Sequence, residues 1–186
     1  ILTPGVKSSD LVLGDKNALM VAARILAYGP DYECEVTNPN TGNTVDYTFN
    51  LAECEFKKVG KDVTENNFDF ELPVSKKKVT FKILTSQDEA DIEKELENIG
   101  KLGSEVKPEL TTRLRYIITS VEGESEKGKI NSFIKTMLSR DSLALRSEVT
   151  KVSPDIELEQ EINIEGDTVK VAIPMTVNFF WPNSGT

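Results

Sequence analysis

Two arms of alternating apolar residues, between positions 156 and 173, constrain the fold of this chain more than any other feature. Glu165-Gly166-Asp167 lies between the arms and predicts a turn. Because such alternation buries one face of a ribbon and leaves the other in water, we expect a β-hairpin that lies on a core without being enclosed by it. The apolar positions are Ile156, Leu158, Ile162 and Ile164 on the first arm and Val169, Val171 and Ile173 on the second.

A helix is predicted near the start of the chain, with Asp15 as its N-cap and its end at about Ala27, before Gly29-Pro30. Apolar residues recur at helical spacing and also fill the remaining faces. A helix that is apolar nearly all round is expected to be buried in the middle of the fold. The spaced residues are Leu19, Ala22, Ala23 and Leu26, and the others are Met20, Val21 and Ile25.

Two further hairpins are predicted in the first half of the chain. In the first, residues 32–36 pair with residues 45–51 around the turn Asn38-Pro39-Asn40-Thr41-Gly42. In the second, residues 68–72 pair with residues 79–83 around Pro73 and three consecutive lysines. We interpret the lysines as a solvated turn.

The middle of the chain predicts four helices. Ser86 and Glu89 form an S-x-x-E capping box at the start of a mostly exposed helix. Pro108 begins a second helix that continues to Val121, and two shorter helices follow it, the last ending at Ser153-Pro154. We expect the last three helices to pack as a small bundle because their apolar faces are broad and their loops short.

These patterns together predict an α+β fold in three segments. The third segment is expected to pack either alone or as one unit with the first. The segments are residues 1–84 with the helix and two hairpins, residues 85–152 with the helical bundle, and residues 153–186 with the last hairpin and an aromatic tail.

Composition describes a globular protein without the usual chemical groups of an enzyme: 38% of residues are apolar and 28% are charged. A net charge of −9 disfavours nucleic acid as the main partner. No apolar run approaches the ~18 residues that span a bilayer, so we expect no membrane insertion. Histidine is absent, which removes the commonest general base and metal ligand. We expect no catalytic residue, no metal and no cofactor.

The two cysteines, Cys34 and Cys54, are too few for a disulfide scaffold. Without histidine they also fall short of the four ligands of a structural zinc site. We interpret them as reduced, half-buried thiols of a cytosolic protein.

Two groups of side chains are candidates for binding a partner. Phe179, Phe180 and Trp181 either fold back onto the chain's own core as a C-terminal strand or anchor another subunit. Arginines in the predicted bundle either pair with surface acids or orient the helices against a partner, and we select Arg140 and Arg146 as partner-binding residues. The arginines considered are Arg113, Arg115, Arg140 and Arg146.

Five stretches also carry a family resemblance. They are LGDKNALMVAARILAYG (Leu13 to Gly29), LRYIITSV (Leu114 to Val121), SRDSLALR (Ser139 to Arg146), VSPDIEL (Val152 to Leu158) and IPMTVNFFWP (Ile173 to Pro182). Together they resemble the baseplate hub proteins of contractile-tailed bacteriophages of the T-even type. The stretches follow the family's order over most of the chain, and the last is the most specific.

The resemblance implies a non-enzymatic role in virion morphogenesis, as a subunit of the tail baseplate hub or as an assembly factor for it. The implied partners are other tail proteins, met in the host cytoplasm during assembly. A permanent virion subunit and a chaperone that leaves are both open, and so is association between copies of the chain.

The resemblance also implies hairpins related to a zinc ribbon. Relatives carry a C-P-x-C-G-like knuckle in the first hairpin and often a cysteine pair in the last. This chain keeps Pro39 and Gly42 in the first turn and lacks the cysteines. We therefore interpret both hairpins as zinc-free remnants of a ribbon.

Two other function classes are weighed against the leading one. A tail-associated cell-wall hydrolase with a pair of carboxylates is the main alternative, because the chain has 31 acidic residues. Such an enzyme needs one desolvated carboxyl group, whereas the acids here fall mostly on predicted wet faces. A nucleic-acid-associated factor is a third class, which the net charge disfavours.

Overall fold

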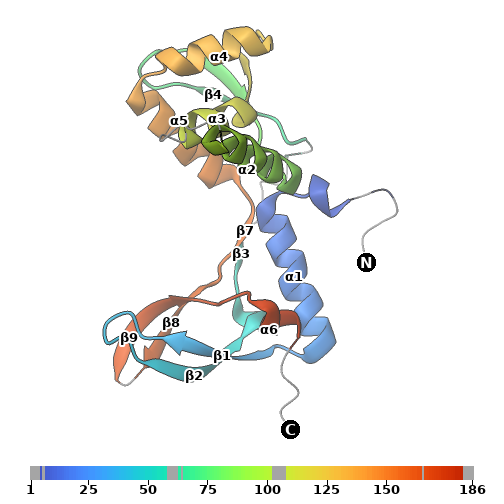
Figure 1. Ribbon diagram of the computed structural model, residues 1–186, viewed down its shortest axis with the longest axis vertical. Helices are drawn as coiled ribbons and strands as arrows, with labels where there is room; N and C mark the ends of the chain where they lie inside the picture. Colours follow the sequence, from blue (N-terminus) through green and yellow to red (C-terminus); the bar gives the residue numbers. More distant parts are fainter. Residues whose placement is uncertain are drawn as a thin grey trace. The chain divides into compact units, whose positions relative to one another are not determined.

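Alternating apolar residues become antiparallel strands, and helical stripes become helices, in the computed structural model of this chain (Figure 1). The model describes residues 5, 7–57, 63, 65–101, 108–164 and 166–181. Each sheet in this part of the chain is small and antiparallel. The predicted α+β class is confirmed.

The chain divides into two compact units, each made from two separate stretches of sequence. Unit 1 is Ile1–Leu13 with Lys58–Pro154, and unit 2 is Gly14–Lys57 with Asp155–Thr186. This division differs from the predicted segments. The second hairpin lies in unit 1 with the helices, because its strand β5 (Lys78–Phe81) also pairs with a strand that follows α3 (Glu109–Ile117).

Unit 2 contains three small sheets. Two are hairpins with short turns, and the third is a two-residue pairing between the stretches that join the hairpins to the rest of the chain. Its elements are α1 (Leu13–Tyr28), β1 (Asp31–Thr37), β2 (Thr44–Asn50), η2 (Leu51–Glu53), β3 (Phe56–Lys57), β7 (Asp155–Ile156), β8 (Glu159–Ile164), β9 (Asp167–Ala172) and α6 (Val177–Phe180). The sheets are β1–β2, β3–β7 and β8–β9.

The two hairpins of unit 2 share one hydrophobic core. Tyr32 and Phe49 of the first hairpin and Ile162 and Val169 of the last are buried in the same cluster, together with Phe179. Both alternating patterns are confirmed by the strand registers. One detail of the prediction is wrong. Ile156 leaves the last hairpin and pairs in β7 with Phe56 of β3.

The turn of the first hairpin is closed by hydrogen bonds within the loop itself. The backbone N–H of Asn38 donates to the carbonyl of Asn43 at 2.8 Å, and the N–H of Gly42 donates to the carbonyl of Asn38 at 2.8 Å. The side-chain oxygen of Asn38 accepts from the N–H of Asn40. Gly42 has φ of +77°, a conformation that favours glycine. The turn is therefore closed by backbone and side-chain hydrogen bonds of the loop.

Helix α1 is not buried in the middle of the fold, so that prediction is wrong. Leu19 is 41% exposed and Leu26 is 79% exposed, whereas Val21 and Arg24 are buried. The helix therefore packs through the Val21–Arg24 edge, and Leu19 and Leu26 face outward. The facing hairpins already fill the core of unit 2, so the helix contributes one edge only.

Unit 1 packs helices on a three-stranded sheet. The sheet order is β4–β5–β6, and Val79 and Phe81 of β5 share a core with Leu114, Ile130 and Leu145 of three helices. The elements are η1 (Ser8–Asp10), β4 (Phe68–Glu71), β5, α2 (Ser86–Lys101), α3, β6 (Ile118–Val121), α4 (Lys127–Thr136) and α5 (Ser139–Val152). The predicted pairing of the second hairpin is confirmed.

Two predictions in unit 1 are corrected. The helix expected to reach Val121 ends at Ile117, and the following residues form β6. The capping box at the start of α2 lies one residue earlier than predicted. The Thr85 hydroxyl accepts from the N–H of Asp88, and the Asp88 carboxylate accepts from the N–H of Thr85. Among the described helices, none combines the length and hydropathy of a membrane span.

Candidate protein-binding surfaces

The aromatic tail divides between the core and the surface. Phe179 is fully buried, and its ring meets those of Tyr32 and Phe180 edge-on, with centroids 5.0 Å apart in each case. Trp181 is 73% exposed. The segment is the short helix α6 instead of the predicted strand. The two alternatives for the tail therefore apply to different residues. Phe179 packs in the chain's own core, and Trp181 is exposed at the surface.

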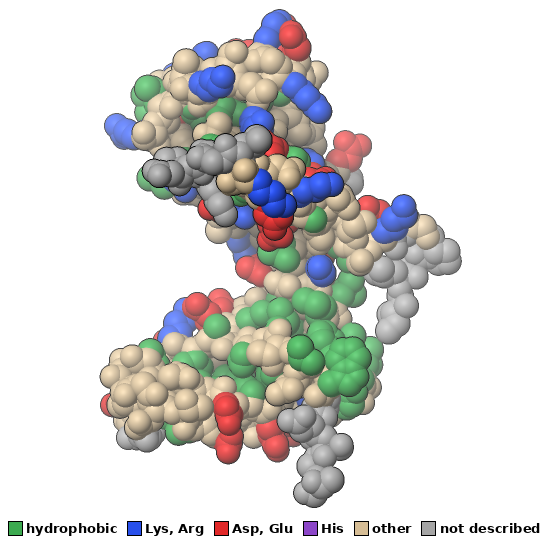
Figure 2. All heavy atoms as spheres, in the orientation of Figure 1, with side chains coloured by type: hydrophobic (Ala, Val, Ile, Leu, Met, Phe, Trp, Pro, Cys, Tyr) green, Lys and Arg blue, Asp and Glu red, His purple; other side chains and the backbone are tan. Residues whose placement is uncertain are grey.

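Exposed apolar side chains gather around this tail. We define the α1–α6 patch as Leu26, Tyr28, Val177 and Trp181, each more than half exposed. Figure 2 shows hydrophobic side chains collected over the C-terminal end of α1 and over α6. Large contiguous apolar patches are among the surface features that proteins use for association, so this patch is a candidate binding surface.

The two helices of the patch are held together through Arg24. Its guanidinium lies 4.9 Å from the ring centroid of Tyr28 and 5.7 Å from that of Tyr32, which packs on Phe179. Arg24 also donates to the carbonyls of Gly29 and Asp31. Aromatic and cation–π contacts beneath the patch therefore hold its two helices in place.

The predicted partner-binding arginines lie in the other unit. Arg140 and Arg146 are exposed on α5, and no ion pair is found for either within the described ranges. Arg140 and Arg146 belong to unit 1 through α5, and the aromatic tail belongs to unit 2 through α6. Arg113 and Arg115, which were considered with them, form ion pairs with Glu89 and Glu95.

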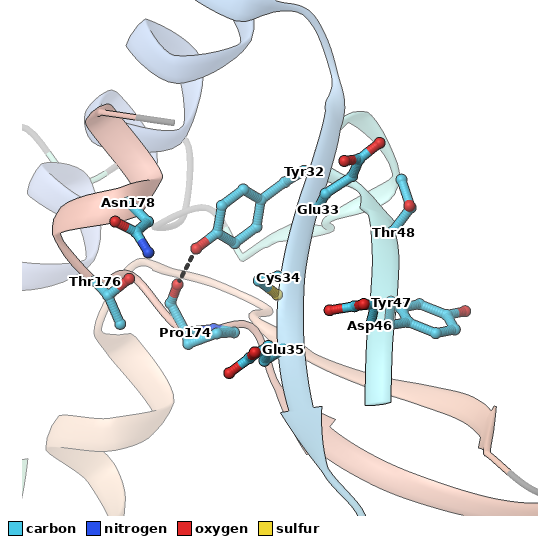
Figure 3. A pocket seen from close by; sticks show the side chains of 10 residues that line it. All are labelled: Tyr32, Glu33, Cys34, Glu35, Asp46, Tyr47, Thr48, Pro174, Thr176 and Asn178. Carbon is cyan, nitrogen blue, oxygen red and sulfur yellow. Dashed lines mark hydrogen bonds between the residues drawn. The ribbon is translucent and has the colours of Figure 1, made fainter. Parts of the chain in front are cut away.

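A cleft of about 640 Å³ lies in unit 2 beside β1 (Figure 3). The residues 174–178 that precede and begin α6 lie on one side of β1, and β2 lies on the other. Three acidic side chains line the cleft and no lysine or arginine does. The lining residues are Tyr32, Glu33, Cys34, Glu35, Asp46, Tyr47, Thr48, Pro174, Thr176 and Asn178.

Sequence reasoning missed this cleft. Glu33 and Glu35 alternate with buried residues on β1, and this pattern was interpreted only as the wet face of a hairpin. The missing information is that, among the described strands, β1 pairs with β2 alone, so one edge of β1 has no strand partner there. Two-stranded pairing is a tertiary fact that alternation along one strand cannot reveal.

Both cysteines are free. Burial raises the pKa of the Cys34 thiol and of the Cys54 thiol, so both stay protonated at neutral pH. The Cys54 sulfur accepts from the side-chain amide of Gln160 at 3.6 Å. Thiols in this state are poor nucleophiles and poor metal ligands. Across the residues that the structure describes, no group of three or more Cys, Asp or Glu side chains could hold a metal ion.

Comparison of the chain with protein-family models, curated proteins and solved structures finds no match.

Proposed function

We propose that this chain is a non-enzymatic component of a phage tail baseplate hub, either a subunit or an assembly factor, that acts by binding other tail proteins. The observation that carries the proposal is the exposure of Trp181, which extends from the buried anchor Phe179 within the stretch that most resembles the family. Tryptophan is enriched among residues that dominate binding at protein interfaces.

The α1–α6 patch supports this function physically. Its side chains are supplied by two helices whose arrangement is fixed by Arg24 and Tyr32, so little order has to be gained on binding. A net charge of −9 keeps such a chain dispersed before it meets its partner. Arg140 and Arg146 on α5 supply exposed cationic groups for a second contact.

The alternative, a cell-wall hydrolase, is disfavoured by the environments of the acids. A general acid needs a carboxyl group whose pKa is raised by a desolvated pocket. Glu33, Glu35 and Asp46 in the cleft are exposed. Asp141 is the buried carboxylate within the described part of the chain, and hydrogen bonds from Ser75 and Val74 outweigh its burial and lower its pKa. Asp141 therefore stays ionised and accepts hydrogen bonds from the backbone.

Affinity capture after co-expression tests the proposal. The tagged chain is co-expressed with the tail proteins of a T-even-type phage, and we expect it to retain at least one of them. Trp181→Ala should abolish retention without changing the melting temperature. Leu110→Ala, which removes an exposed apolar side chain from α3, is the matched control and should retain the partner. Failure of the wild-type chain to capture any tail protein contradicts the proposal.

A second measurement separates the two roles. A permanent hub subunit is present in purified virions at a fixed copy number, whereas an assembly factor is present in infected cells and absent from virions. Quantitative mass spectrometry of both samples distinguishes them. Peptidoglycan turnover by the purified chain would restore the hydrolase alternative.

A further inference from the structure

The outer edge of β1 carries backbone groups that have no strand partner in the part of the chain that the structure describes. The N–H of Leu51 donates to the carbonyl of Pro30, and the N–H of Asn38 donates to the carbonyl of Asn43, each at 2.8 Å. Both bonds involve an even-numbered residue of the first arm of the β1–β2 hairpin, and hydrogen-bonded positions alternate along an antiparallel pair. The even-numbered residues of β1 therefore exchange backbone hydrogen bonds with β2. The odd-numbered residues, including Glu33 and Glu35, therefore direct their N–H and C=O groups to the opposite edge.

The Asp31 end of this edge is closed by a hydrogen bond, but its middle is open. Arg24 donates to the carbonyl of Asp31 at 3.3 Å and satisfies the first outward group. For the backbone groups of Glu33 and Glu35, no hydrogen bond to another part of the described chain is found. An unpaired edge of this kind is a template for a further strand.

The wall opposite this edge cannot act as that strand. Pro174 has no N–H to donate, and its carbonyl already accepts from the Tyr32 hydroxyl at 2.9 Å. The Tyr32 side chain thus holds the 174–178 segment through Pro174, and the cleft of about 640 Å³ is lined by this segment, by β1 and by β2 (Figure 3). The free edge of β1 remains without a strand partner because the 174–178 segment does not pair with it.

Charge selects what the cleft can accept. Glu33, Glu35 and Asp46 line it, and Glu35 lies directly across the sheet from Asp46. Like charges at opposed positions repel, and a cation placed beside them relieves the repulsion. In an added strand the residues beside Glu33 and Glu35 are two apart and share one face. The fitting sequence therefore has lysine or arginine at alternate positions.

We propose that the free edge of β1 binds an extended basic segment of a partner protein, which adds to the β1–β2 sheet as a third strand. Main-chain hydrogen bonds to Glu33 and Glu35 supply affinity, and their carboxylates supply selectivity for alternating cations. This surface is distinct from the α1–α6 patch, so the inference holds or fails independently of the hub assignment.

Peptide binding to the intact chain tests this inference. The probe is a short synthetic peptide of alternating lysine and valine, and its affinity is measured by fluorescence anisotropy at low and high salt. We expect saturable binding that weakens with salt, and about tenfold weaker binding to the double variant Glu33→Gln/Glu35→Gln. The charge-matched control is Glu93→Gln/Glu161→Gln, which neutralises exposed acids elsewhere and should bind like wild type.

Two further probes separate strand addition from simple charge attraction. The same peptide methylated on alternate backbone nitrogens keeps its charge but loses its donors, and it should bind weakly. Amide hydrogen exchange at Glu33 and Glu35 should slow when the unmodified peptide is bound.

Each contrary result overturns the proposal. These results are no saturable binding up to about 1 mM peptide, equal binding of a glutamate–valine peptide, undiminished binding of the methylated peptide, or unchanged exchange at both amides. A self-associated chain whose Glu33 and Glu35 amides are protected without peptide would assign the edge to a second copy and likewise overturn it. Absence of peptide binding combined with a soluble monomer would show that the acids only guard the edge against aggregation.

Discussion

The ring of Tyr32 meets the ring of Phe179 edge-on, with their centroids 5.0 Å apart and both side chains shielded from solvent. This contact joins β1 to α6 across most of the length of the sequence. It also orders the tail so that Trp181 is presented outward while Phe179 is held in the core.

Phe179→Ala should lower the free energy of unfolding by about 3–5 kcal/mol, because a buried aromatic ring leaves a cavity. Trp181→Ala should change the same quantity by less than about 0.5 kcal/mol, because its side chain is mostly solvated. Urea titration followed by circular dichroism measures both. Equal losses in the two variants would show that Trp181 packs in the core.

Tyr32→Phe should cost about 1 kcal/mol through the lost hydrogen bond to the Pro174 carbonyl. Burial raises the pKa of Tyr32. The unfolded tyrosine therefore ionises first, near pH 10, so this contribution is complete below that pH and is lost as pH rises towards the folded pKa. Stability should fall less steeply at alkaline pH in Tyr32→Phe than in wild type. The exposed control Tyr28→Phe should keep the wild-type slope.

Asp141→Asn should destabilise unit 1 by about 1–3 kcal/mol, because the carboxylate accepts from the N–H groups of Val74 at 2.8 Å and Ser75 at 3.0 Å. Burial opposes the charged form, but these hydrogen bonds lower its pKa. Stability from this group is complete above the ordinary pKa, near 4, and is lost as pH falls through the folded value.

Acid titration checks this sign. The difference in unfolding free energy between wild type and Asp141→Asn should be largest at neutral pH and shrink below about pH 4. Asp167→Asn is the matched control, since this exposed carboxylate lies at a turn of the other unit. A difference that grows as pH falls would contradict the assignment.

Thr85→Ala should cost about 1 kcal/mol, because the Thr85 hydroxyl caps the N–H of Asp88 at the start of α2. Ser86→Ala tests the cap that the sequence predicts and should cost less, because its hydroxyl donates to the Leu11 carbonyl at 3.2 Å and caps no N–H group. Thermal unfolding of the two variants ranks them. A larger loss of stability for Ser86→Ala would show that Ser86 is the cap, as the sequence predicts.

The thiols should react slowly with Ellman's reagent, Cys54 more slowly than Cys34, because burial raises both pKa values and Cys54 is the more buried. A chelator should leave the melting temperature unchanged, and elemental analysis should detect no zinc. A fall in melting temperature on chelation would contradict the interpretation of the hairpins as zinc-free remnants.

The hairpins were predictable because each carries its own information. Alternation at Phe68 and Phe70, followed by Val79 and Phe81, specified both the strands and their register. The break between α3 and β6 was not predictable in this way. Ile117 and Ile118 continue the apolar stripe of the helix, yet β5 needs a partner on its second edge, and pairing with β6 determines the outcome.

The candidate site was predictable only in part. The aromatic tail was identifiable from composition, but which ring is buried depends on Tyr32, far away in sequence. The burial of α1 was predicted wrongly because Leu19 and Leu26 are as apolar as Val21, and only packing distinguishes them. The acidic edge of β1 gave no signal, since exposed glutamates are common on any strand that faces water.

The division of unit 2 into two distant stretches also sets an order of events on the ribosome. The first hairpin is synthesised early, but the strands that cover its apolar face are translated only after the whole helical unit. Unit 1 can fold while Tyr32 and Phe49 still lack part of the core against which they pack. A nascent chain of this design completes the core of unit 2 only after Phe179 has left the ribosome.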